Sequence, residues 1–444
     1  MYSEVRNPHI NKNRGVRMFT KIKLEQGVTL YTRKSDQFKT VNFAVKWKND
    51  LDEKTVAARA VLANVLEDSN GKYRTQSALR NKLDDMYGTV LYTNIAKRGN
   101  THIVSLNVEC VNDEYLTDGG VLDEAIELIQ TVIFEPNMDE GKFNSDIVAR
   151  EKRSVAERIR SQYDNKTSYA QKRMLEILRP NSPASISSDG TEEAVIALTP
   201  ETLLAAYESM MTEDEIDIYV VGDVDEAEIA EKLKEVLNFT ARSSRKKVAF
   251  KTDETVKEEK LKQVREKQDM KQGKLHLGFS TPVTFQHPDY SKMQVANGVF
   301  GGFAHSKLFM NVREKESMAY YASSSYASHY GLVYVMAGID AELEEKAVKL
   351  INEQLTVLQN GDITDLEMDQ TKALLKNSLT STFDSARGQI EVYDQFKEMD
   401  ENFTADLLIS KWDAVTKDDV KEMAATIKLE IVYLLSGKDA VTNE

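Results

Sequence analysis

The chain has 444 residues, of which 41% are hydrophobic and 29% charged, and its formal net charge is −14. This length exceeds one ordinary hydrophobic core, so we expect a globular protein with two domains. The acidic excess argues against a general affinity for nucleic acid or anionic membranes. We find no apolar run long enough to span a bilayer and no signal-peptide core. The single cysteine, Cys110, excludes an internal disulfide framework, and we expect a cytoplasmic protein.

The first 240 residues read as an α+β domain. Residues 40–47 are the clearest strand, because Val41, Phe43, Val45 and Trp47 alternate with more polar residues. Further strands are predicted at residues 17–24, 28–33, 89–96, 102–110 and 216–221. Helices are predicted at residues 55–66, 75–86, 121–133, 140–163, 168–178, from about 200, and 226–237.

The same order of signals returns after residue 272. Residues 241–272 carry many charges and little periodicity, which indicates a solvated linker between domains 1–240 and 273–444. In the second domain, strands are predicted at residues 273–279, 320–328 and 332–337, and helices at 290–300, 306–316, 342–358 and 364–383. The last segment, from Val415 to Gly437, repeats the helix-then-strand pattern of Leu198 to Asp223. We interpret the chain as a duplicated α+β unit with mostly antiparallel sheets.

The stretch from Val299 to Asp340 holds the candidate site residues of the second domain. Gly301 and Gly302 permit a bend or a close backbone approach, and Ser306 can cap the short helix that follows. Arg313 and Tyr320 lie seven residues apart where that helix gives way to a strand. Both could donate hydrogen bonds to one carbonyl or carboxylate. Spacing alone favours a simpler interpretation, with Arg313 solvated and Tyr320 packed at a strand edge.

The glycine turn followed by SKLFMNVREKESMAYYASS resembles the second-domain signature of the pitrilysin/insulinase zinc-peptidase family, which includes the mitochondrial processing peptidases. The resemblance covers nearly the whole chain and implies two like domains facing each other as a clamshell around a chamber. It also implies that Arg313 and Tyr320 hold the backbone of a peptide at a zinc site. The resemblance is strongest with bacterial members that lack the zinc motif and are associated with the aminopentanol modification of elongation factor P.

The zinc motif of that family, HxxEH, is degenerate in this chain. Histidines at i and i+4 share a helical face and can meet one ion, and the intervening glutamate serves as general base. Aligning the motif on Ser69-Asn70 and the following KYRTQSALRNKLDDMYG puts Ala60 and Asn64 at the histidine positions and Ala63 at the base. The distal glutamate ligand falls at Glu157 or Arg158, and the sequence does not choose between them. We therefore expect no metal site and no cofactor in this chain.

The resemblance suggests a non-catalytic subunit without metallopeptidase activity of its own. In two-chain members of the family, one chain supplies its arginine and tyrosine to the other chain's zinc site. We therefore expect a partner subunit that bears HxxEH and zinc, with peptide as the substrate, in a heteromeric zinc peptidase. The alternative is a stand-alone peptide-binding or scaffold protein that captures an extended peptide at a sheet edge. A homodimer is a further arrangement open to the isolated chain.

Overall fold

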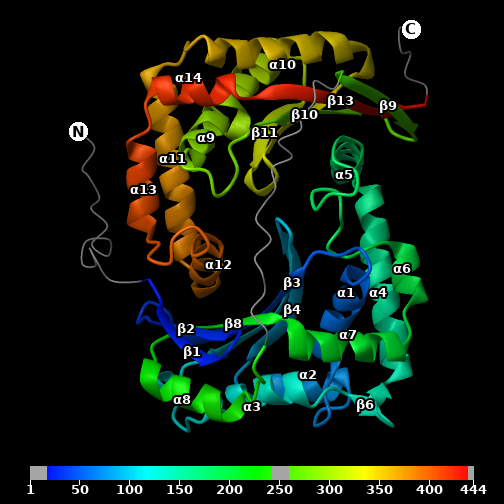
Figure 1. The fold of residues 1–444 in the computed structure, drawn as a ribbon, viewed down its shortest axis with the longest axis vertical. Coiled ribbons are helices and arrows are strands. Elements are labelled where there is room, and N and C mark those ends of the chain that lie inside the picture. The colour runs from blue at the N-terminus through cyan, green and yellow to red at the C-terminus, as the bar shows by residue number, and fades with distance from the viewer. Residues whose placement is uncertain (1–17, 243–259, 439–444) are drawn as a thin grey trace.

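Figure 1 shows the computed structural model, which describes residues 18–242 and 260–438. In the first half, most strands and helices lie within a few residues of their predicted bounds. The helix predicted from residue 140 begins instead at Ser145, because Asn144 Oδ1 accepts hydrogen bonds from the first-turn amides and a short hairpin precedes it. The elements of this half are β1 (Thr20–Glu25), β2 (Val28–Lys34), β3 (Thr40–Asp50), α1 (Val56–Asp68), α2 (Gln76–Asp85), β4 (Val90–Arg98), β5 (Thr101–Val111), η1 (Asp113–Tyr115), α3 (Val121–Phe134), β6 (Met138–Asp139), β7 (Lys142–Phe143), α4 (Ser145–Asp164), α5 (Lys166–Leu178), α6 (Glu192–Ala197), α7 (Pro200–Glu213), β8 (Glu215–Gly222) and α8 (Glu226–Val236).

The second half contains two helices, at residues 386–396 and 405–413, that the sequence analysis did not predict. Its elements are β9 (Lys262–Gln268), β10 (Gly273–Ser280), α9 (Tyr290–Asn297), η2 (Gly298–Gly302), η3 (Leu308–Lys315), β11 (Tyr321–Ala327), η4 (Ser328–Tyr330), β12 (Leu332–Ile339), η5 (Ala341–Leu343), α10 (Glu344–Gln359), α11 (Asp365–Phe383), α12 (Ala386–Phe396), α13 (Ala405–Asp413), α14 (Lys417–Ala425) and β13 (Lys428–Gly437).

Each half is built on one sheet. The first sheet has the order β1-β2-β8-β3-β5-β4, and the second has the order β11-β12-β10-β13-β9. Neighbouring strands are antiparallel except for the parallel pairs β2–β8 and β9–β13. When the first order is read from β4 and the second from β11, the two orders match strand for strand, and among the described strands only β1 lacks a counterpart. The α+β class with two similar domains is therefore confirmed.

Two local predictions for the second half need correction. Residues 262–268 were assigned to a charged linker but form β9, the edge strand beside β13. Alternate residues of β9 are exposed, so its polar composition resembles that of a linker. Residues 243–259 of that linker lie outside the described residues. The predicted helix at 306–316 is a π-helix, η3, and Gly301 before it lies so close to β11 that a Cβ would be 2.7 Å from Ser324 N.

The helices that cover the two sheets are partly exchanged between the halves. The first half packs α1, α3, α4 and α7 on one face of its own sheet, and the second half packs α9, α10, α11 and α14 on its own. The other face of each sheet is covered by a helix from the opposite half (Figure 1). Helix α5 packs on β10 and β13, and α12 packs on β8 and β3. Because α5 and α12 hold equivalent places in the repeat, the exchange is reciprocal.

None of the helices within the described ranges combines the length and apolar composition that crossing a bilayer requires.

Candidate functional site

Helix α1 carries the positions to which the zinc motif was aligned. Ala60 and Ala63 are 0% and 2% exposed and belong to the hydrophobic core of the first domain. Asn64 is partly exposed at the edge of that core. The two alanines therefore contribute packing at the positions predicted for a metal ligand and the general base.

Helix α4 supplies the polar neighbours of Asn64. Asn64 Nδ2 donates to Glu151 Oε2 at 3.2 Å, and Arg158 Nη1 donates to Asn64 Oδ1 at 3.5 Å. Glu151 and Arg158 are seven residues apart, about two helical turns, so they share a face of α4. Glu157 is exposed and lines a shallow surface groove. Of the two candidates for the distal position, Arg158 is the one that contacts α1. The sequence analysis missed Glu151, which the seven-residue spacing from Arg158 could have indicated.

The surroundings of Asn64 do not fit a zinc ion. They offer one amide, one carboxylate and the guanidinium of Arg158, whose fixed positive charge opposes a divalent cation. Over residues 18–242 and 260–438, no three side chains of His, Cys, Asp or Glu are grouped so that they could hold a metal ion.

Arg59 anchors α1 to the first sheet. Its Nη1 lies 2.6 Å from Asp214 Oδ2, and its Nε donates to His102 Nδ1 at 3.0 Å. His102 Nε2 then donates to Ser188 O at 2.9 Å. Burial, assisted by Arg59, lowers the pKa of His102 to about 4, so the ring is neutral at pH 7. His102 is therefore a structural group that fixes the position of the helix.

Arg313 and Tyr320 lie at the two ends of the η3–β11 connection and have different partners. The Arg313 guanidinium lies over the Phe309 ring, 4.6 Å from its centroid, and Nη1 is 3.6 Å from Glu314 Oε1. Tyr320 is 61% exposed, and its hydroxyl donates to Asp340 Oδ1 at 3.3 Å. The structure does not pair the two side chains with each other, and it leaves both accessible from solvent.

The residue after Tyr320 connects this segment to the first half. Tyr321 Oη and Thr167 Oγ1 are 3.3 Å apart, and Thr167 is in the first turn of α5, directly after α4. Lys166 Nζ also donates to Gln268 Oε1 of β9 at 2.7 Å. The start of β11 is therefore held next to the junction of α4 and α5.

Strand β4 is the edge strand of the first sheet beside α1. A side chain of α1 partly blocks its outward-facing backbone groups. The backbone N–H of Thr93 donates to Glu67 Oε2 at 2.7 Å. Thr93 Oγ1 also lies 3.0 Å from the carbonyl oxygen of Ala63. Glu67 thus occupies a hydrogen-bonding position that an added strand would use.

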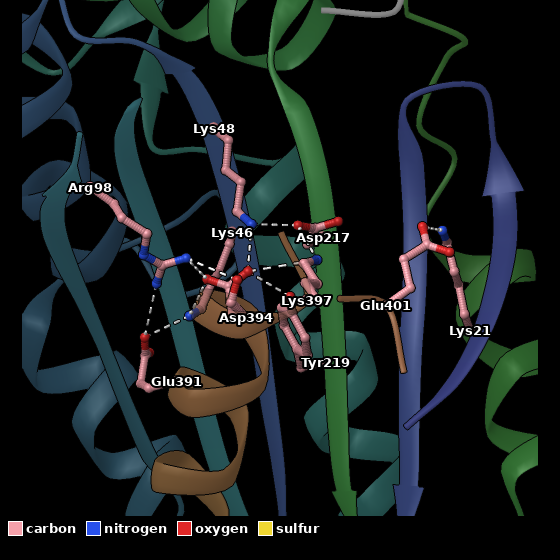
Figure 2. Close-up of polar contacts among 10 residues, drawn as sticks. All are labelled: Lys21, Lys46, Lys48, Arg98, Asp217, Tyr219, Glu391, Asp394, Lys397 and Glu401. Atoms are coloured by element: carbon pink, nitrogen blue, oxygen red, sulfur yellow. Dashed lines mark hydrogen bonds and ion pairs between the residues drawn. The ribbon is translucent and has the colours of Figure 1, made fainter. Parts of the chain in front are cut away.

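The sequence analysis also missed a buried group of charges where α12 meets the first sheet. We call it the Asp394 cluster (Figure 2), and its members are Lys46, Lys48, Arg98, Asp217, Tyr219, Glu391, Asp394 and Lys397.

Asp394 is the acceptor at the centre of the cluster. It is 0% exposed, and its oxygens lie 2.5 to 3.1 Å from four donors, which are Lys46 Nζ, Lys48 Nζ, Arg98 Nη1 and Tyr219 Oη. Burial alone would raise the pKa of Asp394, but the surrounding cations hold it well below its usual value.

Lys397 is the cation on the α12 side of the cluster, which also contributes Glu391 and Asp394. Its Nζ lies 2.7 Å from Asp217 Oδ2 and 3.9 Å from the centroid of the Tyr31 ring. Desolvation lowers the pKa of Lys397 to about 8, although Asp217 opposes the shift. The cluster holds four cations and three carboxylates, and the neighbouring cation Lys48 adds to the lowering of the pKa of Lys397.

A cavity of about 170 Å³ opens beside Lys397 and is lined by both domains. Tyr31, Lys48 and Glu215 line it from the first domain, and Tyr393 and Glu398 from the second. Any movement of α12 relative to the first sheet would change the shape of this cavity.

A family model and a similar protein both point to inactive peptidase homologues. A family model described as "Peptidase M16 inactive domain" matches residues 197–375. The chain is 34% identical to the probable inactive metalloprotease YmfF of Bacillus subtilis (strain 168), over 94% of this chain and 97% of the relative.

Two solved structures share the fold. A conserved protein from Enterococcus faecalis V583 superposes with a TM-score of 0.89 at 34% identity, covering 96% of this chain and all of that one. A peptidase M16 inactive domain from Pseudomonas fluorescens superposes with a TM-score of 0.76 at 16% identity, covering 96% of this chain and all of that one.

Proposed function

Because the chain belongs to the M16 peptidase family, as one of its inactive homologues, we propose that it is a non-catalytic subunit that binds peptide and completes the zinc site of an active partner. The proposed partner is a family member that bears HxxEH and holds the zinc ion. The proposed compartment is the cytoplasm, which agrees with a buried free thiol at Cys110.

The contrast between the two candidate sites carries this proposal. On α1, the positions of the motif are two buried alanines and an asparagine bound to Arg158, so metal-assisted hydrolysis has no support there. On the second domain, Tyr320 is exposed and Arg313 is partly exposed, and both are hydrogen-bond donors suited to a peptide carbonyl or a developing oxyanion. A subunit with this distribution can serve a zinc site that another chain provides.

Purification of the chain from its native host, under conditions that preserve complexes, tests the proposal. We expect a stoichiometric companion of similar length that contains HxxEH, and peptidase activity that requires both chains and is lost on chelation. Recovery of the chain alone or as a homodimer, with the HxxEH-bearing relative fully active without it, would contradict the proposal.

A stand-alone peptide-binding protein is the second candidate, and the exposed edge of β4 favours it. An extended peptide could pair with this edge by strand addition. The bond from Thr93 N to Glu67 weakens the case, because a peptide would have to displace that carboxylate. This second function predicts micromolar binding of extended peptides by the isolated chain, strengthened in Glu67→Ala, without any companion.

A further inference from the structure

Within the described residues, the reciprocal exchange of α5 and α12 creates two helix-on-sheet contacts between the halves of the molecule. Both helices pack on the two central strands of the opposite sheet, β10 and β13 for α5 and β3 and β8 for α12. The contacts are equivalent in the repeat, but their chemistry differs.

The α5 contact is built like a hydrophobic core. Ala170, Met174 and Leu178 of α5 pack with buried residues of the second sheet, among them Ile431 and Leu435. The fit is close: a Cβ added to Gly278 of β10 would lie 2.9 Å from Leu178 Cδ2. Two ion pairs, Arg173–Glu266 and Arg179–Glu430, also join α5 to this sheet, and both are only partly buried. Separating α5 from this sheet would expose apolar surface to water, which is unfavourable, and would bring little compensating hydration of charged groups.

The α12 contact has the buried ions of the Asp394 cluster at its centre. Apolar and aromatic residues surround these ions and belong to the same hydrophobic cluster as the core of the second domain; Phe19, for example, stacks on Tyr393 with ring centroids 4.5 Å apart. Burying these charges removes them from water, and their mutual pairing only offsets that cost. When α12 separates from the sheet, Lys46, Asp217 and Asp394 regain their hydration. Opening at α12 also exposes apolar surface, but the hydration that these fully buried ions regain offsets part of that cost, whereas α5 has no fully buried ions to hydrate.

We propose that α5 is the permanent contact between the two domains and that α12 is a reversible lock, so that the domains open at the Asp394 cluster while they stay joined at α5. The cavity beside Lys397 lies at the lock and widens when it opens. Asp394 is a positioning residue in this device: it holds α12 in one place on the first sheet. The proposal goes beyond the proposed subunit role and does not depend on it.

Hydrogen–deuterium exchange of the full-length chain, read by mass spectrometry, tests the lock. In the wild-type protein, we expect amides of α12 to exchange at least about tenfold faster than those of α5, because local opening exposes only α12. Asp394→Asn keeps the shape of the side chain and removes its charge, leaving the lysines of β3 without their shared partner. We expect it to speed exchange in α12 by about tenfold or more, with exchange in α5 and α10 unchanged.

Two variants serve as matched controls. Glu398→Gln changes a carboxylate that lines the cavity, forms none of the close ion pairs of the cluster and acts on Arg98 only through its charge, so exchange in α12 should change much less than in Asp394→Asn. Arg173→Gln removes one of the two partly buried ion pairs between α5 and its sheet, and exchange in α5 should not change because the contact is apolar. If Asp394→Asn does not fold, Lys397→Met gives the same comparison from the α12-side cation.

Equal exchange of α5 and α12 in the wild-type chain would overturn the proposal. So would an increase spread evenly over both domains in Asp394→Asn, since the cluster would then belong to a common core. Unchanged exchange in α12, or failure of both Asp394→Asn and Lys397→Met to fold, would also count against a reversible lock.

Discussion

Arg313 and Tyr320 are the residues through which the proposed subunit would act on its partner's substrate. Removing one donor to a developing oxyanion costs about 10²–10³ in rate, because the donor stabilises charge that appears only in the transition state. We therefore expect Arg313→Ala and Tyr320→Phe each to lower turnover of the reconstituted pair by about that factor, with assembly intact. Turnover and complex mass should be measured on the same samples.

Arg313→Lys is the informative companion, since lysine keeps the charge and loses the planar fork. We expect it to be nearly as harmful as Arg313→Ala. If all three variants turn over substrate normally, the two residues do not act at the partner's site.

Arg158 decides whether a zinc site can be restored on α1. The purified wild-type chain should contain no stoichiometric zinc by elemental analysis. The triple variant Ala60→His, Ala63→Glu, Asn64→His should remain a poor zinc binder, because Arg158 places a fixed positive charge beside residue 64. Adding Arg158→Glu should restore affinity measurable by calorimetry, whereas adding Glu157→Gln should have no effect. Equal zinc binding with and without Arg158→Glu would mean that the motif is misplaced.

Lys397 makes the free energy of unfolding of the chain vary with pH in the alkaline range. Its pKa is lowered to about 8 in the folded protein, against about 10.4 for a lysine in an unfolded chain. Between these values the unfolded state binds more protons, so the contribution of Lys397 to stability rises as the pH increases. Urea unfolding at pH 7.5 and 9.5 should show this gain in the wild type and not in Lys397→Met. The same pH dependence in both proteins would contradict the assignment.

The placement of the zinc motif on α1 stays a prediction. The alignment put the motif at Ala60, Ala63 and Asn64 and left Glu157 and Arg158 unresolved, because a shift of one residue turns a helical side chain by about 100°. That choice depends on how α4 packs against α1, which no local pattern in the sequence encodes. Glu151 lies seven residues before Arg158 on the same face of α4, so its spacing indicates it only once Arg158 has been chosen.

The elements η2 and η3 position Arg313, and Gly301 controls how closely they approach β11. A Cβ at Gly301 would lie 2.6 Å from Ser324 Oγ and 2.7 Å from Ser324 N, and the backbone atom has little room to move. We expect Gly301→Ala to cost about 1–3 kcal/mol of unfolding free energy by overpacking. Gly302→Ala is the matched control, because its nearest neighbour, Asn297 O, is 3.2 Å away. Denaturant unfolding of both variants measures the two losses of unfolding free energy. Equal losses in Gly301→Ala and Gly302→Ala would contradict a special role for Gly301.

Elements with a clear period were predicted well, and elements defined by distant partners were not. The alternation of Val41, Phe43, Val45 and Trp47 correctly predicted β3. The opposite face of that strand carries Lys46 and Lys48, a pattern typical of a solvated surface. The structure buries both, because α12 brings Asp394 from almost 350 residues away. Strand β9 was missed because it is a short, highly charged edge strand.

Trp47 and Trp412 report on the two domains of the whole molecule. Trp47 lies on β3 and Trp412 on α13, and both are almost fully buried. Because one hydrophobic cluster extends from the second domain to Phe19 and Tyr219 of the first, we expect the domains to unfold together. Single-tryptophan proteins made by Trp47→Phe and by Trp412→Phe should show the same urea midpoint by fluorescence. Separate midpoints would mean that the domains unfold independently.

The two-domain organisation was predictable because the order of elements repeats along the chain. The exchange of α5 and α12 was not, because the repeat pattern is the same whether each helix covers its own sheet or the opposite one.

That exchange has a consequence for the origin of the fold. A single half made alone would carry a helix with no sheet to cover and a sheet with no helix to cover it. Two such halves would satisfy each other by trading that helix, as subunits of a domain-swapped homodimer do. The present chain has the topology of such a dimer joined end to end. We therefore expect an ancestral half-length protein to have been an obligate dimer, with fusion making the exchange intramolecular.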